Sequence, residues 1–190
     1  LIQENGVLLS SQNSENQLRA GLAGKQHEVV GGFAPEYIEK LKNGQDIKLA
    51  ISWGRGDYQK GLDTVIDGFE KFVNNTGDKD TLLLLGGDLS ISPEEGDRVI
   101  NRVKILSQKG NFKGRIALLN GFAPGLPFAS AADVSVFPSR FAPCELTDLE
   151  SKHMLCTPIV TDCQGLGQKN FDPDIPKEAQ LADGFKTKHE

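Results

Sequence analysis

Apolar residues are sparse and irregular up to residue 46, and from Ile47 onward they fall into short runs that alternate with helical periods. The short runs have the length and composition of strands that are buried on both faces. They span residues 47–53, 81–87, 115–122, 134–137 and 158–162. Between them, spacings of three and four residues and helix-start residues predict helices. These helices cover residues 62–73, 92–110, 126–132 and 143–155.

Strands that alternate with helices in this way predict a parallel sheet joined by right-handed crossovers. We therefore expect an α/β fold, a Rossmann-like parallel sheet with helices on both faces. In such folds ligands bind beyond the carboxyl ends of the strands. The loops at that edge are residues 54–61, 86–91, 121–125, 138–146 and 162–167.

Two of the predicted helices begin with the spacing of a capping box, in which the cap residue and the residue three positions later bond each other's backbone N–H groups. Ser92 and Glu95 have this spacing, with Pro93 at the first helical position. Thr147 and Glu150 repeat it. For Glu150, a role as cap partner and a role in ligand binding are both open.

The first 46 residues are polar and weakly periodic, which indicates a connector or the end of a preceding lobe. Within them, residues 31–35 predict a turn and residues 36–42 a short helix. We expect a connector over residues 1–46 and a Rossmann-like lobe over 47–190. The chain begins with Leu and contains one Met, which is typical of a piece of a longer protein.

Charge and cysteine usage narrow the classes of partner. A net charge of −5 and an isoelectric point of about 5.3 argue against nucleic acid, which usually meets a basic face. A small phosphorylated ligand needs only a few local cations and is compatible with an acidic chain.

No apolar run approaches the roughly 18 residues that a membrane span requires. Three cysteines without zinc-site spacing predict reduced thiols in the cytoplasm.

The loop over residues 54–61 enters a predicted helix and carries Arg55 and Lys60. A helix N-terminus has free N–H groups, and Arg and Lys add a bidentate fork and a point charge, so this combination suits a phosphate. Two phosphate motifs are near misses, because Leu62 replaces the Lys of a P-loop and the Rossmann fingerprint lacks its third Gly. The alternative is a solvated turn with two surface cations.

Arg140 lies in a second loop of this kind, residues 138–146. We expect Cys144 to be a small buried residue and His153 a helix-surface or packing residue, rather than catalytic groups. Trp53 is expected in the core. Phe122 is expected there too, although its position after a strand end also suits contact with a nucleotide base. No Ser/His/Asp or Cys/His arrangement is placed for nucleophilic catalysis.

Four stretches resemble glycogen and starch synthases in order and spacing. Residues 55–63 resemble the Arg-x4-Lys-Gly-Leu/Ile-Asp segment of that family. Residues 132–147 resemble its Ala-Asp segment that continues to Pro-Ser-Arg-Phe-Glu-Pro-Cys-Gly-Leu-Thr. Residues 157–166 and 182–185 are similar to its later Pro-Val-Val to Gly-Gly-Leu and Thr-Gly-Phe segments. The likeness covers roughly residues 45–186.

The resemblance implies the nucleotide-sugar-binding lobe of a retaining GT-B glycosyltransferase, a lobe that is inactive by itself. In that family the residues that match Arg55 and Lys60 hold the donor diphosphate and stabilise it as the leaving group. Because these cations neutralise the diphosphate, the resemblance implies neither a metal nor another cofactor. Arg55 and Lys60 are therefore the expected catalytic residues.

The resemblance also implies a donor site and partners. Backbone N–H groups at Leu146 and Thr147 would bind a phosphate, and Glu150 would bind ribose hydroxyls. The full set of implied donor-binding residues is Gly54, Phe122, Arg140, Glu145, Leu146, Thr147 and Glu150. The implied partners are a nucleotide sugar, the other lobe of the full protein, and a glucan or protein acceptor. The location is the cytoplasm, or a host cytosol for a secreted effector.

Two positions depart from the family pattern. Ala142 stands where the family has a sugar-contacting Glu, and Glu145 stands where a Gly lets the backbone approach the phosphate. A carboxylate at that place repels a diphosphate unless it points away. Three interpretations follow. They are a glycosyltransferase with a diverged site, a non-catalytic lobe that serves as a scaffold or interaction module, and a plain dinucleotide-binding domain, which would lack the G-x-G-x-x-G fingerprint.

Overall fold

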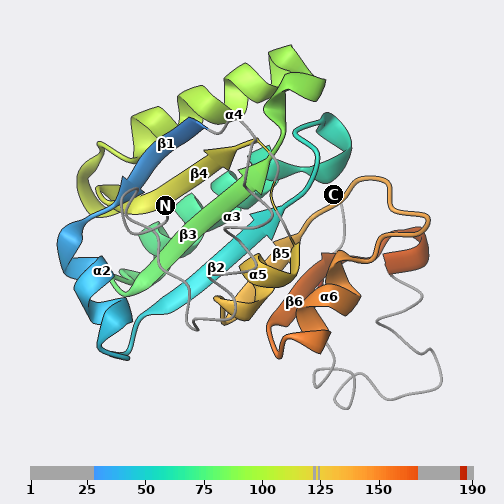
Figure 1. The fold of residues 1–190 in the computed structure, drawn as a ribbon. Coiled ribbons are helices and arrows are strands. Elements are labelled where there is room, and N and C mark those ends of the chain that lie inside the picture. The colour runs from blue at the N-terminus through green and yellow to red at the C-terminus, as the bar shows by residue number, and fades with distance from the viewer. Residues whose placement is uncertain (1–27, 122, 124, 167–184, 188–190) are drawn as a thin grey trace.

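The computed structural model describes residues 28–121, 123, 125–166 and 185–187 (Figure 1). Its strands are β1 (Glu28–Phe33), β2 (Lys48–Trp53), β3 (Thr81–Gly87), β4 (Arg115–Asn120), β5 (Val134–Phe137), β6 (Thr157–Thr161) and β7 (Phe185–Thr187). Its α-helices are α2 (Pro35–Lys42), α3 (Leu62–Thr76), α4 (Pro93–Leu106), α5 (Gly125–Ser130) and α6 (Thr147–His153). Short 3-10 helices are η1 (Tyr58–Lys60), η2 (Leu89–Ile91) and η3 (Gly110–Phe112).

The described strands form one seven-stranded sheet in the order β1-β4-β3-β2-β5-β6-β7. All neighbouring strands are parallel except β1 and β4, which pair antiparallel. The expected α/β fold with helices on both faces is therefore confirmed, with an antiparallel strand added at one edge. The alternating elements predicted between residues 47 and 162 are also present, with ends shifted by a few residues.

The turn predicted over residues 31–35 is wrong, because residues 28–33 form β1. Gly31 has φ of +73°, and a Cβ there would lie 2.6 Å from the carbonyl oxygen of Ile116. The glycine is therefore needed because the backbones of two paired strands approach closely at this position. From the local sequence alone, a glycine with this role looks the same as a glycine in a turn. The helix predicted over residues 36–42 is confirmed as α2. Residues 1–27 of the predicted connector lie outside the described residues.

Alternating side chains of the central strands sort into two cores. In β3, Leu82 and Leu84 face one core together with Phe128 of α5, whereas Leu83 and Leu85 face the other together with residues of α3 and α4. All four leucines are 3% exposed or less. Such burial on both faces explains why the run is apolar throughout, since a strand of a covered parallel sheet has no solvent side.

The predicted capping box at α4 is wrong. The helix begins at Pro93, as expected, but Ser92 makes no side-chain cap hydrogen bond. Glu95 instead accepts a hydrogen bond from Arg98 one turn later, at 3.1 Å. The helix ends at Leu106, and the residues up to Phe112 include the short helix η3.

An apolar groove of about 580 Å³ opens on the α3 side of the sheet, between α3 and the strands β2, β5 and β6. Phe72, Val136 and Ile159 are among its lining residues, and none of the predicted site residues is. The described helices α5 and α6 pack on the opposite face, where Ser151 of α6 bonds Ser135 of β5. Pro138 and Thr161 also line the groove, so it borders the carboxyl-edge loops although no predicted site residue lies in its lining.

Gly61 joins η1 to α3 in the left-handed conformation, with φ of +67°, and a Cβ there would lie 2.6 Å from the carbonyl oxygen of Pro138. We predict that Gly61→Ala lowers the free energy of unfolding by about 1–3 kcal/mol, because it adds both backbone strain and a steric clash. Urea denaturation measures the change.

Gly68, in the middle of the exposed face of α3, is the matched control, because a Cβ there meets nothing within 4 Å. Gly68→Ala should raise the free energy of unfolding by about 0.5–1 kcal/mol through helix propensity. Equal denaturation midpoints for the two variants would contradict the close approach of Gly61 to Pro138.

Candidate functional site

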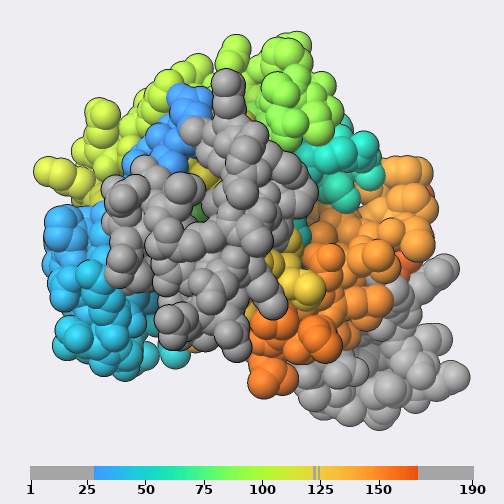
Figure 2. All heavy atoms as spheres, viewed as in Figure 1, coloured from blue at the N-terminus to red at the C-terminus, as the bar shows by residue number. Residues whose placement is uncertain are grey.

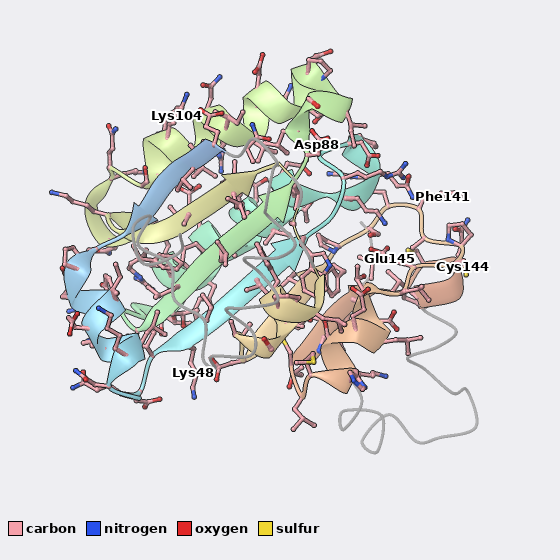
Figure 3. The ribbon with its side chains drawn as sticks, in the orientation of Figure 1. Lys48, Asp88, Lys104, Phe141, Cys144 and Glu145 are labelled. Carbon is pink, nitrogen blue, oxygen red and sulfur yellow. The ribbon has the colours of Figure 1, made fainter. Side chains whose placement is uncertain are left out.

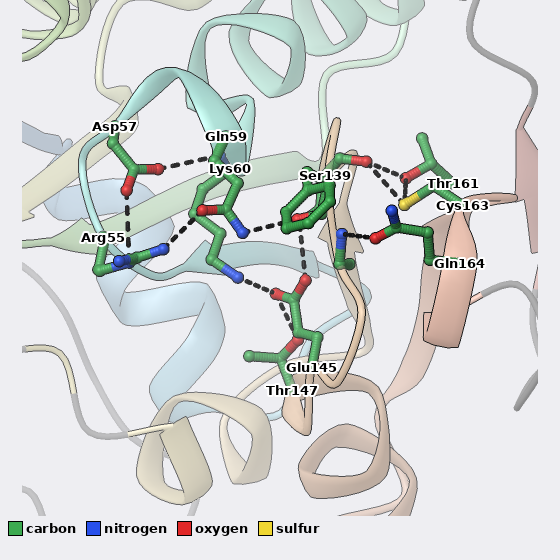
Figure 4. Close-up of polar contacts among 12 residues, drawn as sticks. Arg55, Asp57, Gln59, Lys60, Ser139, Glu145, Thr147, Thr161, Cys163 and Gln164 are labelled. Carbon is green, nitrogen blue, oxygen red and sulfur yellow. Dashed lines mark hydrogen bonds and ion pairs between the residues drawn. The ribbon is translucent and has the colours of Figure 1, made fainter.

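The loop from β2 to α3 and the loop from β5 to α6 lie side by side at the carboxyl edge of the sheet (Figure 2, Figure 4). The backbone N–H of Arg140 donates to the carbonyl of Gln59 at 2.8 Å. In return, the side-chain amide of Gln59 donates to the carbonyl of Phe141 at 2.7 Å. These bonds bring Lys60 and Glu145, two predicted site residues from different loops, into contact.

Lys60 and Glu145 form an ion pair in which Nζ lies 3.0 Å from Oε1, with side chains only 16% and 3% exposed. The Glu145 carboxylate also accepts hydrogen bonds from the hydroxyls of Ser139, at 2.8 Å, and Thr147, at 3.0 Å (Figure 4). Buried charges are tolerated when they are paired and hydrogen-bonded. The ammonium and the two hydroxyls thus account for a carboxylate held inside the loop.

Arg55, the other predicted catalytic residue, stays at the surface of the same loop with 54% of its side chain exposed. Its guanidinium donates to the side-chain oxygen of Gln59 at 2.6 Å and lies 3.3 Å from the Asp57 carboxylate. Gly54 lies under the stem of Lys60, since a Cβ there would be 3.4 Å from Lys60 Cγ. Arg55 and Lys60 therefore share one loop but have different environments.

Arg140 binds the start of α3, because its guanidinium donates two hydrogen bonds to the Asp63 carboxylate, at 3.1 and 2.8 Å. It also donates to the carbonyl of Tyr58 and lies over the Tyr58 ring, 4.0 Å from its centroid. Each of the three predicted cations, Arg55, Lys60 and Arg140, therefore contacts a carboxylate. Carboxylates of the same loops and of the start of α3 therefore balance the positive charge of these three side chains.

The Asp63 carboxyl titrates below its ordinary range. Burial alone would raise its pKa, but the hydrogen bond from Arg140, a backbone hydrogen bond at Thr64 and the charge of Arg140 outweigh burial and lower it. The Arg140–Asp63 pair is therefore ionised at neutral pH and ties the β5–α6 loop to α3.

The predicted capping box at α6 is wrong. The N-cap is Leu146, whose side chain makes no cap bond, and Thr147 directs its hydroxyl to Glu145 instead. Glu150 turns toward β2: burial raises the pKa of its carboxyl, and a hydrogen bond from the Trp53 indole partly offsets that rise. Trp53 is buried, as expected, with its ring 4.6 Å from that of Phe137.

The last residue of β6 and the loop that follows support the β5–α6 loop, and their residues were not predicted as site residues. The carbonyl of Ser139 accepts hydrogen bonds from Thr161 Oγ1, at 2.6 Å, and from Cys163 Sγ, at 3.1 Å. The side-chain oxygen of Gln164 accepts the backbone N–H of Ala142 at 3.2 Å. Their place at the end of a parallel strand and directly after it was the available signal, because the loops of adjacent parallel strands emerge at the same edge.

The remaining predicted residues have varied positions. Leu146 and Cys144 are exposed, so the expectation that Cys144 is buried is wrong (Figure 3). In the β5–α6 loop, the side chain of Ala142 packs in the hydrophobic core and is 1% exposed. Phe122 lies outside the described residues. Cys156 is buried, and burial raises the pKa of its thiol to about 11, which makes it unreactive at neutral pH.

Within the ranges that the structure describes, no group of three or more His, Cys, Asp and Glu side chains is arranged to hold a metal ion. In the same ranges, no helix is long and apolar enough to cross a membrane.

We predict that Asp63→Asn lowers the free energy of unfolding at pH 7, because it breaks the fork with Arg140. The folded pKa of Asp63 lies below the unfolded value of roughly 3.9, so its stabilisation is present above about pH 4 and is lost as the pH falls below that. The deficit of the variant should therefore shrink between pH 5 and pH 3 in urea denaturation.

Asp67→Asn is the matched control, because Asp67 makes a more exposed pair with Arg102 at 2.6 Å. Its effect should be smaller, as is usual for surface pairs. If the loss of unfolding free energy in Asp63→Asn stays constant with pH, the lowered pKa of Asp63 in the folded state is contradicted.

No family model matches the chain. It is 34% identical over 148 residues to a glycogen synthase of Mesorhizobium japonicum, an alignment that covers 75% of this chain and 27% of that protein. The chain thus spans about a quarter of the length of the relative it matches.

Solved structures agree on the fold. The catalytic domain of starch synthase IV from Arabidopsis thaliana, bound to ADP and acarbose, superposes with a TM-score of 0.56 at 19% identity, covering 94% of this chain and 32% of that one. Anabaena HepE in complex with UDP-glucose superposes with a TM-score of 0.58 at 16% identity, covering 82% and 39%. The chain is therefore glycogen synthase-like in sequence and has the fold found in part of GT-B glycosyltransferases.

Proposed function

We propose that this chain is the donor-binding lobe of a glycosyltransferase, which moves a hexose from a nucleotide diphosphate sugar to a glucan or protein acceptor. One observation carries the proposal. Arg55 and Lys60 lie on the same loop at the carboxyl edge of the sheet, where ligands of such folds bind. A second loop, from β5 to α6, packs against this loop. The likeness to glycogen synthases supports the choice of a glycosyl donor over other phosphorylated ligands.

In the proposed reaction, Arg55 and Lys60 stabilise the charge that develops on the departing diphosphate. Such preorganised charges act on the transition state without help from a metal ion. Arg55 is exposed, and among the residues that the structure describes its polar contacts are to Asp57 and Gln59 of its own loop, so it can turn to a ligand at low cost. Lys60 reaches a ligand only by sharing or leaving Glu145. Glu150, beside Trp53, is the proposed contact for the ribose.

The proposal includes a second lobe, which supplies the acceptor site and lies outside this chain. The partners are accordingly a nucleotide sugar, that lobe and the acceptor, with no nucleic acid, and the proposed location is the cytoplasm. By itself the chain should bind a nucleotide without turning it over.

A second candidate is a non-catalytic lobe that serves as a scaffold or interaction module. Two observations favour it: the Ala142 side chain is buried where the family pattern has a sugar-contacting Glu, and the Glu145 carboxylate lies on Lys60. Turnover of a nucleotide sugar by the full-length protein would exclude this candidate.

We predict that ADP, UDP or GDP, or one of their sugars, raises the thermal stability of the chain and that Arg55→Ala abolishes the shift. A ligand present at about 100 times its dissociation constant stabilises the folded state by roughly 2.7 kcal/mol, which a thermal-shift assay detects. The measurement is a panel of the three diphosphates and their sugars at saturating concentration.

Lys48→Ala is the matched control, because it removes an exposed cation from the opposite end of β2 (Figure 3). It should leave the ligand-induced shift unchanged. The proposed donor site is refuted if no nucleotide shifts the wild-type chain, or if the two variants lose the shift equally.

A further inference from the structure

The Lys60–Glu145 pair has an arrangement that bears directly on how a donor binds. Glu145 places a full negative charge 3.0 Å from the Lys60 ammonium, where the proposed function puts a phosphate. Both side chains are largely buried, so solvent does little to weaken their attraction. The carboxylate thus takes the place of the anion that the site is proposed to bind.

We propose that Glu145 is a built-in competitor for the donor diphosphate, and that the nucleotide binds only when the Lys60–Glu145 pair opens. This inference rests on the proposed function, since it concerns the same cation. It makes Glu145 a residue that sets the affinity of the site, in contrast to the phosphate-contacting role that the family pattern gives to its position.

The contacts of Glu145 explain why the closed pair is a stable state of the free protein. Ser139 donates to Oε2, whereas Thr147 and Lys60 approach Oε1. These three donors to a carboxylate that is 3% exposed hold it firmly in place. A ligand anion must therefore displace a well-bonded group rather than fill a vacant cation site.

A diphosphate cannot simply join the pair. A second anion beside Lys60 would lie next to the Glu145 carboxylate, which is 3% exposed, and water screens the repulsion between like charges poorly at a buried position. Binding and pairing then oppose each other through Lys60.

The test uses isothermal calorimetry of the chain with ADP, UDP and GDP at fixed ionic strength. Glu145→Gln keeps the size and much of the hydrogen bonding of the side chain and removes its charge. We expect this variant to bind the preferred nucleotide on the order of tenfold more tightly than the wild type. Glu39→Gln, which removes an exposed carboxylate from α2, is the charge-matched control and should not change the affinity.

Two further variants show whether the effect passes through Lys60. Lys60→Gln should weaken binding, and Glu145→Gln should give no gain when Lys60→Gln is already present. Thr147→Val removes one donor to Glu145 and leaves both charges, so it should give a smaller gain in the same direction. Because it retains the ion pair, Thr147→Val also tests the idea if Glu145→Gln does not fold.

The outcomes separate this inference from the function on which it rests. Equal nucleotide affinities for the wild type, Glu145→Gln and Thr147→Val would overturn the competitor role and leave the donor site intact. A gain that persists without Lys60 would overturn it as well. If no folded variant binds any of the three nucleotides, the proposed function itself fails, and the inference fails with it.

Discussion

Burial of β3 on both faces is the constraint on which the arrangement of this molecule depends. Its four consecutive leucines are almost completely covered, so helices must pack on both sides of the sheet. Crossovers between parallel strands then return the chain to the same edge each time, and the loops after β2, β5 and β6 emerge together. The candidate site is a consequence of this geometry, because its residues come from those three connections and from the ends of the elements that they join.

Polar side chains that emerge in so small a space must find partners there. Lys60 is bonded to Glu145 and Arg140 to Asp63, and in both cases the charges come from segments far apart in the sequence. An unpaired charge at the depth of Lys60 and Glu145 would be costly, which explains why this ammonium is accompanied by a carboxylate. The same pairing that stabilises the loops thus limits how much positive charge the free site offers to an anion.

Local patterns predicted the elements between residues 47 and 162 well, because continuous apolar runs and helical spacings report directly on which faces are buried. They failed where a side chain or strand found a partner other than the expected one. Gly31 belongs to an edge strand because β4 lies against it. Glu95, Thr147 and Glu150 leave the expected capping contacts for Arg98, Glu145 and Trp53, respectively. In the last two cases the partner lies outside the helix itself.

The sequence by itself determined the alternation of strands and helices, the edge at which their loops gather, and the set of residues that can meet there, because apolar periodicity and strand polarity are local properties. Only the tertiary structure decided which of these residues pair. Whether Glu145 points into solvent or onto Lys60 depends on how closely two loops approach, and that approach is set by Gly61 against Pro138 and by the support of Thr161 beneath Ser139. Such contacts join remote segments through shape and charge, which no spacing along the chain records.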